Sequence, residues 1–310
     1  MTSATRLNVQ NSGRRRILQY LIWTAAGLVI AWVAISFLAA WFLTRRPRAR
    51  FEEPTPSVAW AAFKPMILQS SDDEQLGAWY SAGDATKAVI LLLHGNSASR
   101  TAMLPQAEVL AKEGYGLLLV TLRAHGDSTG ECNDFGYSSH HDVTAALQWL
   151  KGQAAARPVV VLAQSLGGAA TLFAADELTP EVCGLILESP YRDLATAMWN
   201  RCDHYLPWGL SHVAYAGLRL SGPCFVDVGA ISPERAAARI LTRIPVLLLA
   251  GSKDRRAKPD EAEAIRRQLR GSCKVESFPN GDHGLLLQAE PEHYCRVVSE
   301  FIAKAVRNGQ

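Results

Sequence analysis

The chain has 310 residues and a mass of 33.8 kDa, and its 48% hydrophobic and 20% charged side chains fit a globular protein with one large core. Eight of its 32 Lys and Arg fall within residues 1–50, which hold no Asp or Glu, so the remainder carries 24 basic against 29 acidic side chains. The formal charge of +3 therefore does not indicate nucleic-acid binding, since no basic patch with interleaved aromatics accompanies it.

The first predicted element is an apolar helix of about 27 residues, Ile17 to Leu43, without a single Asp, Glu, Lys, Arg or His. About 20 such residues suffice to cross a bilayer core. A signal peptide has a shorter apolar region, and a buried helix of a soluble protein normally keeps a polar face, so these two alternatives fit less well. We predict a basic tail over residues 1–16 and a transmembrane helix over residues 17–43.

Arginines flank this helix on both sides, so the positive-inside rule gives nearly equal counts. The triplet Arg14–Arg16 directly abuts the apolar residues and favours a cytoplasmic N-terminus, with Arg45, Arg46, Arg48 and Arg50 on the other flank. We expect a single-pass protein of a bacterial inner membrane with its folded domain on the periplasmic side, and the opposite orientation stays open.

Residues 44–57 are rich in arginine, proline and acids, which is typical of a tether. From residue 58 to 306, short apolar runs alternate with amphipathic stretches. An opening antiparallel hairpin, Met66–Gln69 with Leu76–Tyr80, precedes runs of Val, Ile and Leu that are typical of strands buried on both faces. The pattern predicts an α/β fold with a mostly parallel sheet and helices on both faces. The expected strands are Ala88–Leu93, Gly116–Thr121, Val159–Ala163, Gly184–Glu188, Val246–Ala250 and Lys274–Phe278, and the expected helices are Met103–Lys112, Ser139–Lys151, Gly168–Asp176, Pro233–Leu241, Pro259–Leu269 and Pro291–Val306.

The alternation lapses over about forty residues, 190–231, which contain many aromatic side chains. A segment of that length within a compact domain is usually functional, and we predict a cap over the site. An irregular insertion that packs its own small core is the alternative.

Six cysteines show no Cys-x-x-Cys spacing, which gives a zinc site little support. If the domain is exported, Cys202 with Cys224 and Cys273 with Cys295 are candidate disulfides. Small buried thiols are an equally good interpretation.

Three polar residues follow strand patterns in the order of a nucleophile, an acid and a base: Ser165, Asp254 and His283. Ser165 lies in Gln164-Ser165-Leu166-Gly167-Gly168, directly after an apolar run, where a sharp strand-to-helix turn would expose its hydroxyl. Ala163 occupies the first position of the usual Gly-x-Ser-x-Gly motif, and its small size makes that departure tolerable.

The other candidates serve these three residues. Asp254 would orient His283, with Asp193 and Asp260 as rival acids. The backbone N–H groups of Asn96, in His94-Gly95-Asn96, and of Leu166 would form an oxyanion hole. We expect His94 to be structural, because it lies on the wrong turn for a general base.

Together these motifs resemble the α/β-hydrolase superfamily, and most closely its membrane-anchored serine aminopeptidase-like, lysophospholipase-like and Bem46-like members. The resemblance covers residues of about 58 to 306 and includes Leu122-Arg123-Ala124-His125-Gly126-Asp127-Ser128, where relatives usually have Gly in place of Ala124. It implies an α/β-hydrolase fold with a cap, a Ser-His-Asp triad and a turn-packing role for His125.

We therefore expect a membrane-anchored serine hydrolase that cleaves ester bonds of a small acyl or lipid-like substrate, without a cofactor. A peptidase or amidase of the same fold and a noncatalytic scaffold are the alternatives. We also expect no metal site, because adjacent His140 and His141 on a helix would point about 100° apart.

Overall fold

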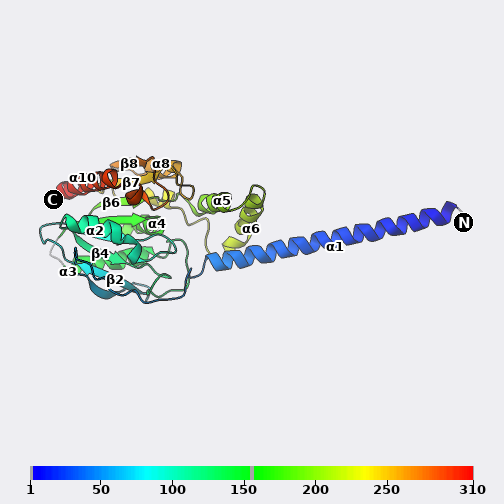
Figure 1. Cartoon of the computed structure of the whole chain (residues 1–310), viewed down its shortest axis with the longest axis horizontal. Helices are drawn as coiled ribbons and strands as arrows, with labels where there is room; N and C mark the ends of the chain where they lie inside the picture. Colours follow the sequence, from blue (N-terminus) through cyan, green and yellow to red (C-terminus); the bar gives the residue numbers. More distant parts are fainter. Residues whose placement is uncertain (1–2, 154–156, 310) are drawn as a thin grey trace.

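The computed structural model describes residues 3–153 and 157–309 and begins with one long helix, α1 (Ser3–Leu43), which extends away from the rest of the chain (Figure 1). Residues 3–16, expected as a tail, are part of this helix. Its segment Arg15–Leu43 is long and apolar enough to cross a membrane, and the most apolar window of 18 residues within it has a mean hydropathy of 2.2. Only 11% of the most apolar window is buried, so α1 is not a core helix.

Residues 44–57 contain no helix or strand, as expected for a linker, yet they are fixed to the domain. The Arg46 guanidinium donates to the carbonyl oxygens of Gly126, Ser128 and Gly130. Glu53 is buried and accepts from Arg100, whose guanidinium is itself only 3% exposed. The segment predicted as a tether is therefore held against the domain by buried polar contacts, which the sequence pattern did not indicate.

An eight-stranded sheet forms the centre of the domain, in the order β1-β2-β4-β3-β5-β6-β7-β8. At one edge β2 pairs antiparallel with both β1 and β4. The strands β3 to β8 run parallel to one another, as the continuous apolar runs predict. The strands are β1 (Lys64–Gln69), β2 (Gln75–Ser81), β3 (Val89–Leu93), β4 (Gly116–Val120), β5 (Val159–Gln164), β6 (Val182–Glu188), β7 (Val246–Gly251) and β8 (Cys273–Phe278).

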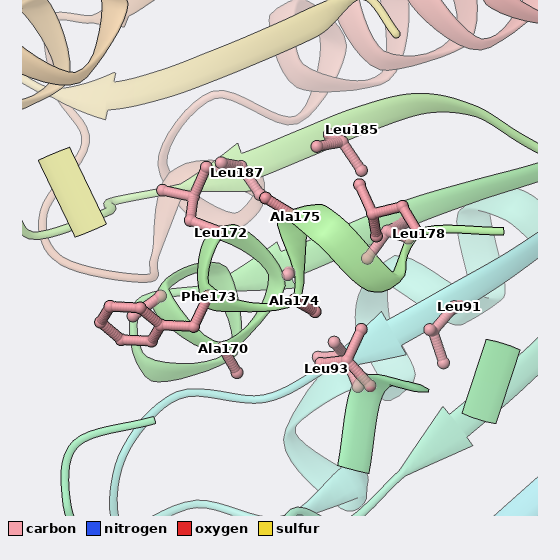
Figure 2. Close-up of a cluster of buried hydrophobic side chains, with 14 of the residues drawn as sticks. Leu91, Leu93, Ala170, Leu172, Phe173, Ala174, Ala175, Leu178, Leu185 and Leu187 are labelled. Atoms are coloured by element: carbon pink, nitrogen blue, oxygen red, sulfur yellow. The ribbon is translucent and has the colours of Figure 1, made fainter. Parts of the chain in front are cut away.

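Alternate residues of the buried strands face two separate cores, one on each side of the sheet. Leu91, Leu93, Leu185 and Leu187 belong to the core on the side of the sheet that α4 and the residues after it cover, as Figure 2 shows. The helices α3 (His140–Gln153), α4 (Leu166–Phe173), α7 (Pro233–Ala237) and α8 (Pro259–Gln268) cover this side, and α2 (Leu104–Lys112), α9 (Leu286–Ala289) and α10 (Pro291–Gly309) cover the other. The predicted helix Pro233–Leu241 ends earlier than expected, at Ala237.

The predicted insertion, residues 190–231, contains a helical hairpin of α5 (Leu194–Tyr205) and α6 (Leu210–Ser221), followed by a short 3-10 turn. In Figure 1 this hairpin projects from the domain on the side of α1. All six cysteines are free thiols, so neither Cys202 with Cys224 nor Cys273 with Cys295 forms a disulfide. The interpretation as small buried thiols fits Cys183 and Cys202, whereas Cys132 and Cys224 are exposed.

Candidate active site

Ser165 lies at the turn between β5 and α4, with φ 48° and ψ −105°. A non-glycine residue rarely adopts a positive φ, and this conformation is typical of a serine held clear of a sheet edge. The turn is possible because its neighbours are small: a Cβ on Gly167 would lie 2.8 Å from the Cβ of Leu93. Backbone bonding fixes it further, since the N–H of Ser165 donates to the Glu188 carbonyl at 2.8 Å.

The three residues predicted to act together do meet at this edge of the sheet. His283 Nε2 lies 3.0 Å from Ser165 Oγ, and His283 Nδ1 lies 2.8 Å from Asp254 Oδ2. The side chains are largely shielded from solvent, with Asp254 fully buried and His283 9% exposed. The arrangement is a continuous hydrogen-bonded chain from hydroxyl to imidazole to carboxylate, although His283 lies 118 positions after Ser165 in the sequence.

Asp254 is held in the form that can orient an imidazole. Its Oδ1 accepts from the N–H groups of Arg256 and Ala257, both at 2.8 Å. Burial acts to raise the pKa of Asp254, but the hydrogen bond and charge of His283, together with the backbone hydrogen bonds from Ala257 and Arg256, outweigh it and leave that pKa below its usual value. The two alternative acids lie elsewhere. The Asp193 side chain accepts the N–H of Thr196 and caps the start of α5, and Asp260 lies in the first turn of α8.

The two expected oxyanion donors border the same serine. The turn after β3 is tied to the start of α4 because the N–H of Gly167 donates to the His94 carbonyl at 3.1 Å. A Cβ on Gly95 would lie only 3.5 Å from the Cβ of Ser165. Among the described residues, the N–H groups of Asn96 and Leu166 donate to no protein acceptor, which leaves both able to bind a ligand.

His94 and His125 are structural, as predicted. His94 is fully buried, donates from Nδ1 to the Gly95 carbonyl and accepts the Leu122 N–H at Nε2. Burial, reinforced by the neighbouring His125, lowers the pKa of His94 to about 3, so its ring is neutral. His125 accepts the N–H of Ser97 and thereby braces the turn that carries Asn96.

Two polar groups that the sequence motifs do not indicate connect the parts of the site. Gln164 Nε2 donates to Glu188 Oε2 at 3.1 Å and to the Gly284 carbonyl at 2.9 Å, so one amide joins the turn of Ser165 to the loop of His283. Asn133 Nδ2 donates to Asn96 Oδ1 at 2.9 Å. Only the position of Gln164 next to Ser165 could have indicated its role.

Glu188 yields a test of this buried network. Burial raises the pKa of its carboxyl from 4.5 to about 7, so the folded state binds a proton that the unfolded state has released. The stability this proton confers is complete below pH 4.5 and is lost as the pH rises through about 7.

A Glu188→Gln variant has no such proton to lose. The original chain should therefore lose stability between pH 4.5 and 7.5 relative to this variant. The difference between their free energies of unfolding, variant minus original, should rise by on the order of 3 kcal/mol over that range, as measured by urea unfolding in detergent. A difference that stays constant over that range would show that Glu188 is already ionised in the folded protein.

One further cluster corrects the sequence analysis. His140 and His141 do not point apart, since their ring centroids lie 3.9 Å from each other. Together with Glu177 they bring three ligand-type atoms within 4.8 Å of one another. Both residues lie in the first turn of α3, where contacts outside the helix influence the direction of a side chain, and the Tyr137 carbonyl lies 2.6 Å from His140 Nδ1.

Comparisons with known proteins agree with this architecture. The model of the family described as serine aminopeptidase, S33, matches residues 84–223. An esterase of Pyrococcus furiosus superposes with a TM-score of 0.65 at 23% identity, over 82% of this chain and 98% of that one. At that identity the likeness concerns the fold alone.

Three curated relatives extend the comparison. An uncharacterized protein of Mycobacterium tuberculosis is 30% identical over 50% of this chain. The match covers about half (54%) of that protein's length. Protein bem46 of Schizosaccharomyces pombe is 24% identical over 90% of this chain and 91% of its own. A thermostable monoacylglycerol lipase of a Bacillus species is 33% identical over 69% of this chain and 90% of its own. With that coverage and the eight-stranded sheet, the chain belongs to the α/β-hydrolase superfamily.

Proposed function

We propose that this hydrolase is a membrane-anchored serine esterase that cleaves an acyl or lipid-like substrate through an acyl-Ser165 intermediate. The observation that carries the proposal is the hydrogen-bonded chain from Ser165 Oγ through His283 to Asp254. A hydroxyl becomes nucleophilic when a base accepts its proton, and His283 Nε2 at 3.0 Å is in range to do so.

The reaction follows from this geometry in two halves. As Ser165 Oγ attacks the ester carbonyl carbon, its proton passes to His283 Nε2, and the carbonyl oxygen takes up negative charge facing the N–H groups of Asn96 and Leu166. His283 then gives that proton to the departing alkoxide, which leaves an acyl-serine. A water molecule then attacks the acyl carbon and gives its proton to His283 Nε2, and His283 returns that proton to Ser165 Oγ as the bond between the acyl carbon and Oγ breaks and the acid leaves. Asp254 keeps Nδ1 protonated throughout.

The substrate class rests on two supports. Two relatives are named as lipid-ester hydrolases, the monoacylglycerol lipase and, at 29% identity over 41% of this chain, a mouse lysophosphatidylserine lipase. The exposed apolar helix α1 would hold the domain at a lipid surface as a single-pass anchor. The arginine triplet at its start favours a periplasmic domain.

A peptidase is the second candidate, favoured by the aminopeptidase description of the matching family. The same triad and oxyanion hole can serve amide bonds, so the choice depends on the pocket and not on the chemistry described above.

A paired substrate series separates the two candidates. We expect the detergent-solubilised full chain to hydrolyse p-nitrophenyl esters, with kcat/KM rising roughly fourfold per added CH2 until the acyl pocket is filled, because each buried CH2 contributes about 0.8 kcal/mol. The matched acyl and aminoacyl p-nitroanilides should be poorer substrates. Faster cleavage of the aminoacyl anilides would favour the peptidase, and indifference to acyl length would reject the lipid-like substrate.

A further inference from the structure

The α5–α6 hairpin is packed against the apolar helix α1, beside which it lies in Figure 1. Trp32 Nε1 of α1 donates to the Val213 carbonyl at 3.1 Å, and Ser221 Oγ of α6 donates to the Ser36 carbonyl at 2.9 Å. Residues more than 180 positions apart are thus directly bonded. The hairpin is therefore attached both to the domain and to the helix that we propose as the anchor.

Small side chains let α1 and α6 approach closely. A Cβ on Gly217 would lie 2.1 Å from Ser36 Oγ, so only glycine fits there. Ser36 and Ala40, one helical turn apart on α1, are buried to 6% and 3% exposure, while most other side chains of this part of α1 remain exposed. Contacts through small residues are typical of helix pairs within membranes.

The contacts also give the direction of α6. Its early residue Val213 meets Trp32, and its last residue Ser221 meets Ser36, so α6 runs toward the domain as α1 does. Its start, and the turn before it, lie farthest from the domain along α1. Trp32 precedes the end of α1 at Leu43 by about 16 Å of helix, at 1.5 Å per residue.

This distance places the turn at the level of the bilayer surface. The apolar run Ile17–Leu43 is about 40 Å long, whereas the hydrocarbon core is only about 30 Å thick. At most about 10 Å of α1 thus extends beyond the core on the side of the domain, which is less than the 16 Å to Trp32. The turn that precedes α6 therefore reaches the boundary between headgroups and hydrocarbon.

The side chains of that turn are apolar and unusually exposed. Trp208 is 91% exposed, and its neighbours Tyr205, Leu206, Leu210 and Val213 are also exposed. Trp and Tyr are the side chains preferred at membrane–water interfaces. The exposed charges of Asp203 and Arg219 on the same hairpin would resist deeper insertion, since a charge in the hydrocarbon core is costly.

The edge of the sheet that carries the candidate site faces the same way. At the end of α1, the Thr44 carbonyl accepts the N–H of Asn133, whose side chain in turn holds Asn96. The hairpin itself begins five residues after Ser189, which lies beside the loop of His283. Anchor, hairpin and site thus converge at one edge.

We propose that the α5–α6 hairpin is a second membrane-binding element, with its turn of residues 205–210 embedded in the headgroup layer of the bilayer that α1 spans. This inference rests on the proposed anchor. The exposed apolar side chains of this turn contact lipid, and the close approach of Gly217 to Ser36 fixes the position of α6 along α1 and thus its depth in the bilayer. The site would then open directly onto the membrane surface.

Tryptophan fluorescence tests the embedding. The full chain is placed in phosphatidylcholine–phosphatidylglycerol vesicles whose acyl chains are brominated either near the glycerol or near the methyl end. Comparison with Trp208→Phe isolates the emission of Trp208, and Trp149→Phe, on α3, serves as the control. We expect Trp208 to be quenched by the glycerol-proximal bromine and shielded from acrylamide in water. Trp208 that is quenched by acrylamide and not by bromolipid overturns the proposal.

A second variant tests the attachment to α1. Gly217→Val should separate the helices and at least halve the bromolipid quenching of Trp208, whereas Gly152→Val, where an added Cβ meets nothing within 4 Å, should leave it unchanged. A melting temperature close to that of the original chain confirms that each variant is folded. Unchanged quenching in folded Gly217→Val contradicts the role of the α1–α6 contact.

Alkaline carbonate extraction distinguishes failure of the anchor from failure of the hairpin. A chain that stays with the vesicles while Trp208 remains in water refutes the hairpin alone. A chain that carbonate releases refutes the anchor, and the hairpin proposal with it, while the esterase chemistry at Ser165 is measured separately on soluble esters.

Discussion

Replacing Ser165 by alanine is expected to abolish labelling by a fluorophosphonate probe and to lower kcat for ester hydrolysis by at least about 10⁴-fold. Alanine removes the oxygen that lies 3.0 Å from His283 Nε2 while keeping the small side chain that the strained turn accepts. The residual rate would come from the oxyanion donors and substrate binding, which require no covalent intermediate. Gel fluorescence and steady-state kinetics on the full chain measure the two effects.

The matched control is Ser189→Ala. Ser189 also has a positive φ, 47°, is buried and ends a neighbouring strand, but its Oγ contacts the N–H of Gly284 and not the imidazole. This variant should still be labelled. Labelling that survives in Ser165→Ala would mean that another residue is the nucleophile. A folded original chain that the probe does not label would instead favour the noncatalytic scaffold.

Asp254→Asn is expected to lower kcat at neutral pH by about 10⁴-fold, the size of effect known for loss of the triad carboxylate in a serine protease. An amide can present its N–H to His283 Nδ1, which then becomes the acceptor and leaves Nε2 protonated and unable to take the proton of Ser165. Protein folding should survive, because the remaining amide oxygen can still accept the N–H groups of Arg256 and Ala257.

The two rival acids supply controls of the same chemistry. Asp193→Asn keeps a good N-cap for α5, and Asp260→Asn changes only the first turn of α8, so both should retain kcat within a few-fold. If Asp193→Asn were the damaging substitution and Asp254→Asn the mild one, the acid of the triad would have to be reassigned. Kinetics of the three variants side by side decide this.

Local sequence pattern was enough to predict the sheet and the three central site residues. Runs such as Val246–Ala250 identify buried parallel strands, and side chains directly after parallel strands must share one sheet edge, which brings Asp254 and His283 to Ser165. The segment expected as a cap forms the α5–α6 hairpin, and its role as a cap stays a prediction, while pattern alone did not reveal its contact with α1.

What the sequence did not reveal depends on partners far apart in the chain. The Gln164 amide reaches Gly284, 120 residues away, and Glu53 reaches Arg100, 47 residues away. Neither contact produces a periodic pattern in the sequence. The role of Gln164 was therefore not predicted, and the segment that contains Glu53 was predicted to be a tether although it is bonded to the domain. For His140 and His141, ideal helix geometry was applied to residues in the first turn of α3, where contacts outside the helix influence the direction of a side chain.

The docked linker has a consequence for how such a protein would find substrate. Arg46 and Glu53 fasten the chain to the domain on both sides of Arg50, so no flexible leash separates α1 from the sheet. A domain on a flexible linker could reach lipids over a wide area around its membrane anchor. With the anchor and the lipid-like substrate proposed above, a rigidly joined domain would reach substrate only through two-dimensional diffusion of the whole molecule or of the lipid.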